Sequence, residues 1–164
     1  MRKIDVKTDA KKNYFEIINL LDELNVLFLK SLKNNMDRTY KFEVTPTQAM
    51  IVYRINNRIL SINDIIKEGY YKGANVTYNL RKLDHNGYIS KTLNHYDGRS
   101  TLIGLTDKGR SLWENIDSVI MSQAEMLTSY DLDDTSINDL IDVLGKIDFL
   151  LRNFKKKKRK NNEL

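Results

Sequence analysis

The sequence predicts a mainly α-helical protein with one small β-hairpin. Apolar residues recur every three or four positions over most of the 164-residue chain, which is the spacing of amphipathic helices. One β-prone stretch, at residues 89–106, contains the hairpin-turn pair Asp97-Gly98. The 41% content of hydrophobic residues is enough to build a core. At this length we expect a single domain, residues 1–164, with extended terminal helices.

Composition excludes several classes of protein. Cysteine is absent, which excludes disulfides, thiol catalysis and cysteine-ligated metal sites. No apolar run approaches the roughly 20 residues that span a bilayer, and the N-terminus lacks the apolar stretch of a signal peptide. We therefore expect a soluble, cytoplasmic protein that has no membrane partner.

The net charge of +5 is unevenly distributed. Residues 58–110 carry nine basic and five acidic side chains, whereas residues 111–154 carry two and nine. The last ten residues carry six basic groups and one acidic group, so the body of the chain up to Phe154 has no net charge. A basic middle segment attracts polyanions, and the like-charge run predicts a disordered basic tail at residues 155–164. Such a tail can hold DNA phosphates without specificity, or serve solubility alone.

The N-terminal helix is predicted over residues 14–38. Its apolar positions follow three- and four-residue steps: Ile17, Leu21, Leu24, Phe28 and Leu32. The segment Thr45-Pro46-Thr47-Gln48 then predicts the start of a second helix, which ends at about Asn56. Threonine can cap this helix, proline suits its first position, and glutamine stands where a capping box needs it.

Two more helices and the hairpin complete a central lobe at residues 45–110. Ser61 starts a short helix that Gly69 ends, and the next helix covers residues 73–86. The hairpin strands are expected at residues 89–94 and 101–106. Three helices followed by a hairpin are typical of a winged helix-turn-helix domain, in which the hairpin is the wing.

Two long helices follow the lobe and together occupy residues 111–154. Thr106 and Asp107 cap the first of them. The second presents apolar residues at alternating steps of four and three: Leu140, Leu144, Ile147, Leu151 and Phe154. This stripe and the one at Ile17, Leu21 and Leu24 are wider than one small domain can cover. They predict long terminal dimerisation helices and a homodimer, with a compact monomeric bundle as the alternative.

The helix at residues 73–86 is the candidate nucleic-acid reader. One of its faces is apolar and would be buried: Val76, Leu80 and Leu83. The opposite face is polar and almost free of carboxylates: Asn75, Tyr78, Arg81, Lys82 and His85. Asparagine can pair with adenine, and arginine with guanine or phosphate, although many solvated helix faces have a similar composition. In the hairpin turn, Arg99 beside Asp97 and Gly98 is suited to a narrow minor groove.

Four motifs, in order and with correct spacing, resemble the MarR family of bacterial transcription regulators. They are Asn75-Val76-Thr77 with Leu83, then Gly87-Tyr88-Ile89, then Asp97-Gly98-Arg99-Ser100, and then Leu105-Thr106-Asp107-Lys108-Gly109-Arg110. The resemblance covers about residues 40–155, and within the family residues 69–80 are most similar to the LdtR-type branch. It implies a homodimer that regulates transcription from a pseudo-palindromic double-stranded DNA operator, and it implies that a small aromatic effector can modulate binding.

The resemblance also implies roles for individual residues. Those facing the major groove would be Asn75, Tyr78, Arg81 and Lys82. Those touching phosphates would be Thr77 and the segment Tyr71-Lys72-Gly73. Arg99, oriented by Asp97, would enter the minor groove. Many members carry two basic residues just before the glycine that ends the reading helix, whereas here these positions are His85 and Asn86, which puts that phosphate contact in doubt.

Other classes of site find little support in the sequence. No catalytic constellation, phosphate loop or dinucleotide motif is present, so we expect neither an enzyme nor a cofactor. His85 and His95 fit a helix surface and the base of the wing better than a metal site. Trp113, Met121 and Met126 could line an effector cavity, although such residues are more often core. A winged-helix module that binds protein instead of DNA is the alternative function.

Overall fold

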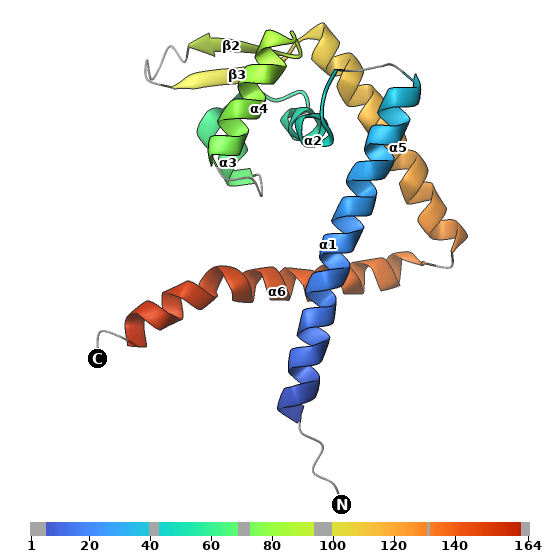
Figure 1. Ribbon diagram of the computed structural model, residues 1–164, viewed down its shortest axis with the longest axis vertical. Coiled ribbons are helices and arrows are strands. Elements are labelled where there is room, and N and C mark those ends of the chain that lie inside the picture. Colours follow the sequence, from blue (N-terminus) through green and yellow to red (C-terminus); the bar gives the residue numbers. More distant parts are fainter. Residues whose placement is uncertain (1–5, 40–42, 69–72, 94–99, 131, 162–164) are drawn as a thin grey trace, which may run out of the picture. The chain divides into compact units, whose positions relative to one another are not determined.

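A computed structural model describes residues 6–39, 43–68, 73–93, 100–130 and 132–161 (Figure 1). The chain divides into two compact units, residues 1–119 and residues 120–164, and we describe each by itself. The helices and strands, in chain order, are α1 (Val6–Thr39), α2 (Pro46–Ile55), β1 (Leu60–Ser61), α3 (Ile62–Glu68), α4 (Gly73–His85), β2 (Ile89–Leu93), β3 (Thr101–Leu105), α5 (Asp107–Ser129) and α6 (Asp134–Asn161). The predicted fold class is confirmed: a mainly helical winged helix-turn-helix with long terminal helices.

Local sequence signals account for how α2 and α3 begin. The Thr45 hydroxyl accepts a hydrogen bond from the Gln48 amide nitrogen (3.2 Å), and the Gln48 side chain accepts one from the Thr45 amide nitrogen (3.0 Å). These two bonds make the predicted capping box, with Pro46 in the first turn. Ser61 and Asp64 cap α3 in a similar way, because the Ser61 hydroxyl accepts from the Asp64 amide nitrogen and donates to its carboxylate. The latter bond lowers the pKa of Asp64.

The sheet has three antiparallel strands in the order β1-β3-β2. Strands β2 and β3 begin at the predicted residues and end one residue earlier, with Ile89 paired to Leu105 and Leu93 paired to Thr101. Strand β1 was not predicted, because two residues are too few to show an alternating pattern. It pairs with β3, and Leu60 lies opposite Ile103. The wing is therefore anchored to the segment that precedes α3.

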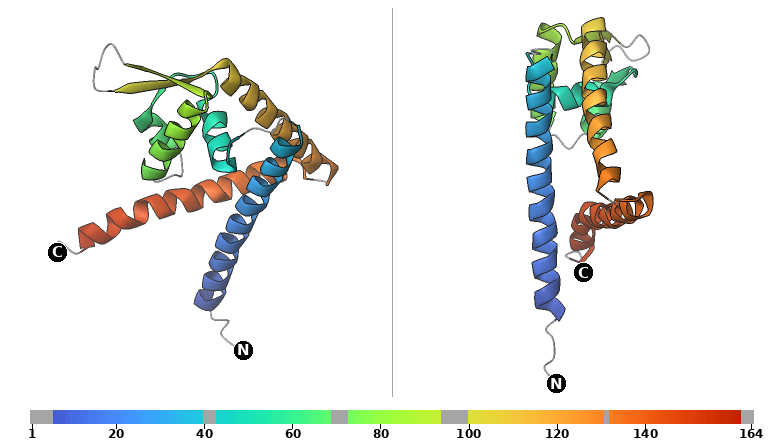
Figure 2. Two further views of the ribbon diagram at one scale, coloured as in Figure 1. Left: turned by 45° about the horizontal axis from the view of Figure 1, so that its top comes forward. Right: turned by 90° about the vertical axis from the view of Figure 1, so that its right-hand side faces the viewer.

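The core of the first unit uses more of the chain than the predicted lobe at residues 45–110. Its fully buried apolar side chains include Leu32 and Met36 from α1 and Leu112 and Ile116 from α5. The end of α1 packs on α2, and the first turns of α5 reach α2 through the stacked rings of Trp113 and Tyr53. Figure 2 shows this unit from two further sides. Helix α1 is also longer than predicted, since it begins at Val6.

The basic residues at 155–160 were predicted to lie in a disordered tail, and in the structure they continue a helix. Helix α6 continues through the six basic residues at 155–160 and ends at Asn161. Lysine and arginine are strong helix formers, and extending an existing helix costs far less than nucleating one. Among the residues that the structure describes, no helix combines the length and apolar character needed to cross a bilayer.

Candidate nucleic-acid interface

Helix α4 is held in the lobe by one apolar face. Val76, Leu80 and Leu83 are almost completely buried, as the helical spacing predicted. The helix packs on α2, α3 and β2, which fixes one side of it and leaves the other side in solvent. The left view of Figure 2 shows α4 beside α2 and α3.

The solvent face of α4 carries the side chains that were predicted to read DNA. Asn75, Tyr78, Arg81 and Lys82 are exposed, and Tyr78 is 60% exposed although it is aromatic. His85 continues the same face into the last turn of the helix. No acidic residue lies in the first turn. This surface combines donors for base edges and phosphates with an aromatic ring, and no carboxylate repels a polyanion there.

The single carboxylate of α4 is paired with the wing. The Nζ of Lys91, on β2, lies 2.7 Å from a carboxylate oxygen of Asp84. Both side chains are partly exposed, so this ion pair contributes little to stability. Its consequence is electrostatic, because it balances the only negative charge of the helix.

Two residues that sequence reasoning missed also belong to this interface. The side-chain nitrogen of Gln48, on α2, donates to the side-chain oxygen of Asn79, on α4, at 3.2 Å. The side-chain nitrogen of Asn79 donates to the backbone oxygen of Asn75 at 2.8 Å. Gln48 was interpreted only as a capping residue. Its second bond joins two helices through residues 31 positions apart in sequence, a contact that no local pattern reveals.

The remaining predicted contact residues divide into two groups. Gly73 is the first residue of α4, and Thr77 is half-buried beside the exposed face. Tyr71, Lys72, Asp97 and Arg99 lie outside the described residues, as does His95. The roles of Tyr71, Lys72, Asp97 and Arg99 in DNA binding stay predictions. The structure does describe both strands of the wing up to Leu93 and from Thr101.

The motifs at the end of α4 and the start of α5 meet in space. Gly87 has a φ of 74°, a left-handed value that glycine adopts readily, and it ends α4. The Thr106 hydroxyl donates to the Gly87 carbonyl oxygen (2.6 Å) and accepts from the Gly109 amide nitrogen (3.1 Å). The ammonium group of Lys108 lies 4.4 Å from the ring centre of the buried Tyr88. This junction joins the reading helix, the wing and α5.

Trp113 is part of the packing within the lobe. Its ring stacks on Tyr53 with the ring centres 5.6 Å apart, and its indole nitrogen donates to the Tyr53 backbone oxygen (3.0 Å). The Tyr53 hydroxyl in turn donates to Asp117 at 3.0 Å, and partial burial and this bond raise the pKa of Tyr53. Met121 and Met126 are more than half exposed. Neither of two hollows among the described residues, one on α6 and one at the root of the wing, is lined by Trp113, Met121 or Met126.

The terminal helices present apolar side chains to solvent. On α1, Leu21 and Leu24 are exposed and Ile17 is half-buried. On α6, Leu140 and Leu151 are exposed and Leu144 and Ile147 are half-buried. The side chain of Phe154 lies outside the described part of the helix.

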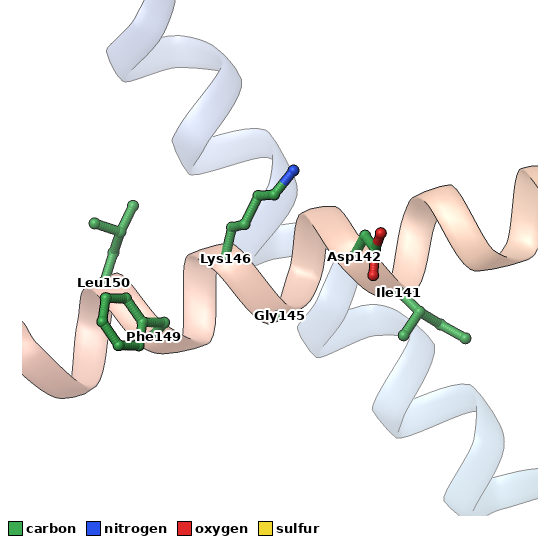
Figure 3. A pocket seen from close by; sticks show the side chains of 6 residues that line it. All are labelled: Ile141, Asp142, Gly145, Lys146, Phe149 and Leu150. Carbon is green, nitrogen blue, oxygen red and sulfur yellow. The ribbon is translucent and has the colours of Figure 1, made fainter.

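Helix α6 also has a second apolar strip. Ile141 and Phe149 are exposed on either side of Gly145, and these three residues line a shallow hollow together with Asp142, Lys146 and Leu150 (Figure 3). Glycine inside a helix costs about 0.5–1 kcal/mol relative to alanine. No atom lies within 4 Å of a Cβ built on Gly145, so packing within the chain does not require glycine there.

Metal binding finds no support in the described residues. They contain no group of three or more histidine, aspartate or glutamate side chains that could hold a metal ion. His85 lies on the exposed face of α4.

Comparisons with known proteins agree with this geometry. Residues 44–109 match the family model of a winged helix DNA-binding domain. The chain is similar to the exopolysaccharide II synthesis transcriptional activator ExpG of Rhizobium meliloti, at 25% identity over 145 residues that cover 88% of this chain and 75% of ExpG. It is also similar to the uncharacterized HTH-type transcriptional regulator YwhA of Bacillus subtilis, at 30% identity over 118 residues that cover 68% of this chain and 84% of YwhA.

Solved structures of proteins bound to DNA share the fold. The complex of Streptococcus pneumoniae FabT with DNA superposes with a TM-score of 0.70 at 18% identity, covering 86% of this chain and 99% of FabT. The Staphylococcus aureus MepR–DNA complex superposes with a TM-score of 0.69 at 22% identity, covering 81% of this chain and 96% of MepR. An Escherichia coli MarR mutant complexed with operator DNA gives a TM-score of 0.67 at 17% identity, covering 82% and 95%.

ExpG is named a transcriptional activator and YwhA a transcriptional regulator. The motifs of α4, the wing and α5 lie in the matched segment. The chain belongs to the HTH-type transcriptional regulators with a winged helix DNA-binding domain, and it has the fold of MarR.

Proposed function

We propose that the protein acts as a homodimer that recognises a pseudo-palindromic DNA operator by sequence. The observation that carries the proposal is the exposed face of α4, where Asn75, Tyr78, Arg81 and Lys82 form a surface with no unbalanced carboxylate. In a helix-turn-helix protein the second helix of the motif lies in the major groove. Here that helix is α4, which follows α3 and rests on α2.

Within this proposal, the contacts divide by chemistry. Asn75 and Arg81 carry the groups that pair with base edges, Tyr78 offers its ring and hydroxyl, and Lys82 binds phosphate. Thr77 and residues 71–73 contact the backbone of the DNA. Arg99, at the tip of the wing, occupies the minor groove, where a narrow width strengthens the negative potential.

The exposed apolar residues of α1 and α6 support the homodimer. Soluble monomers rarely expose large apolar patches, and a second copy of the chain is a partner that can cover the apolar residues of each helix. A twofold dimer also explains a pseudo-palindromic operator, since it places the two α4 helices about 34–36 Å apart, one turn of DNA. The basic end of α6 adds affinity for any duplex, with strong salt dependence.

Modulation by a small aromatic effector is part of the proposal and rests on the family alone. An effector of this class is expected to weaken operator binding without changing the dimer mass. Titration of the operator complex with a panel of small aromatic acids and phenols checks this. If no compound of the panel changes operator binding, the proposed effector is wrong, whereas the proposed recognition of DNA is unaffected.

We expect Arg81→Ala and Arg99→Ala each to weaken operator binding by about 1–3 kcal/mol, because each removes a guanidinium that contacts the DNA. Binding measured by fluorescence anisotropy, on the operator and on a scrambled duplex, checks both. The matched control is Arg152→Ala on α6, where the side chain is 64% exposed and forms an ion pair with Asp148. If the two variants bind the operator as tightly as the control does, the reading surface is misassigned.

A further inference from the structure

We propose that Gln48 is a positioning residue for sequence readout, which sets the rotation of α4 through Asn79. This inference rests on the proposed function, since it assumes that α4 reads DNA. It assigns Gln48 and Asn79, which do not face the groove, a role in determining which bases the protein prefers.

The hydrogen bonds fix the orientation of both side-chain amides. The Oε1 of Gln48 accepts from the Thr45 amide nitrogen at 3.0 Å, so the Nε2 is the end that points to α4. This Nε2 donates to the Oδ1 of Asn79 at 3.2 Å, which leaves the Nδ2 of Asn79 to donate to the backbone oxygen of Asn75 at 2.8 Å. A directional chain of bonds therefore runs from the start of α2 to the first turn of the reading helix.

Burial makes this chain costly to break. Gln48 is 7% exposed and is the one buried polar side chain found in the described core. A buried amide that loses its partner keeps the full cost of desolvation. The apolar contacts of Val76, Leu80 and Leu83 hold α4 on the lobe, but such contacts are not directional and tolerate small rotations. The Gln48–Asn79 bond lies at the edge of the apolar face, where it opposes rotation.

Rotation matters because base readout depends on fine geometry. The side chains of a recognition site must be held within about 0.5 Å and 10–20° of the geometry in which they bind. The side chain of Asn79 is hydrogen-bonded to the backbone of Asn75 itself. The Gln48–Asn79 bond that fixes the helix therefore also fixes its first turn, which carries the Asn75 side chain and enters the groove. Asn75 and Tyr78 are the reading residues nearest to this link in sequence.

The identity of residue 48 gives the sharpest test. Glutamate completes a capping box as well as glutamine does, but it has no N–H to donate. In Gln48→Glu the cap remains, while the Asn79 amide must turn over and give up its bond to Asn75. Asn79→Ala removes the same link without adding charge, at a half-exposed position. Thr47→Glu adds the same charge one residue away and leaves the link intact, so it is the matched control.

The experiment measures base preference at every operator position for the full-length wild-type protein and the three variants. The operator is the sequence that the wild-type protein selects from random duplexes, and each position is then substituted in turn. We expect Gln48→Glu and Asn79→Ala to lower the preference about tenfold at the same few positions of each half-site, with the other positions unchanged. Thr47→Glu should lower affinity for all duplexes equally, because added charge acts without regard to sequence.

The outcomes separate this inference from the function on which it rests. Uniform loss of affinity in Gln48→Glu and Asn79→Ala, with base preference unchanged, would show that Gln48 has only a structural role. If Gln48→Glu does not fold, Asn79→Ala alone decides, since it leaves the cap of α2 intact. Absence of any base preference in the wild-type protein would overturn the proposed function itself.

Discussion

Replacing Gly109 by alanine is expected to destabilise the DNA-binding lobe by about 3 kcal/mol. A Cβ built on Gly109 would collide with the backbone carbonyl oxygen of Tyr88 and lie 3.1 Å from its carbonyl carbon. That oxygen also accepts a hydrogen bond from the Thr106 amide nitrogen at 3.2 Å. Since the obstacle is backbone in the centre of the junction, α5 and the wing must move apart to make room.

Thermal denaturation followed by circular dichroism measures this effect. The lobe belongs to the compact unit at residues 1–119, and for a domain of roughly 100 residues a loss of this size lowers the melting temperature by about 12–24 °C. Gly104→Ala is the matched control, because a Cβ at Gly104 meets only side-chain atoms at 3.9 Å and 4.0 Å. Equal melting temperatures for the two variants would show that the approach of α5 to Tyr88 does not constrain the fold.

The double variant Leu140→Glu, Leu151→Glu is expected to convert the proposed homodimer into a monomer. The two side chains are 57% and 49% exposed in the single chain, so the change should leave the folded protomer intact. In the dimer the double variant would bury two unpaired carboxylates in each subunit. The free energy of burying them far exceeds the binding free energy that an interface of this kind supplies. Because the two lobes then bind half-sites independently, operator affinity should fall by about 100-fold or more.

Light scattering at micromolar concentration checks the first part of this prediction. The wild-type protein should give twice the 19.2 kDa mass of the chain, and the double variant should give 19.2 kDa. Ile59→Glu, at a 70% exposed apolar position of the lobe, should remain a dimer. A wild-type mass of 19.2 kDa contradicts the homodimer, whereas a double variant that stays dimeric places the interface elsewhere.

Features that depend on neighbouring residues could be predicted from the sequence. The capping box at Thr45 and Gln48, the buried face of α4 and the start of both wing strands were predicted correctly, because each follows from local spacing. The exposed face of α4 was predicted for the same reason, since burial of one side of a helix determines which residues the other side exposes.

Features that depend on distant residues could not be predicted. Strand β1 exists only because β3 passes beside it, and Gln48 reaches Asn79 only because α2 and α4 pack together. The pairing of Asp84 with Lys91 likewise needs the wing to fold back on α4. The continuation of α6 into the basic residues also depends on the helix that precedes them.

The most direct test of the central claim is selection of duplexes from a random pool. The full-length protein should be used with the six basic residues at 155–160 replaced by glutamine, which keeps the helix and removes non-specific attraction. The account predicts enrichment of one pseudo-palindrome whose half-sites are centred about one helical turn apart, and loss of that enrichment in Arg81→Ala. Equal recovery of all duplexes by the folded, dimeric protein would contradict the claim that α4 reads sequence.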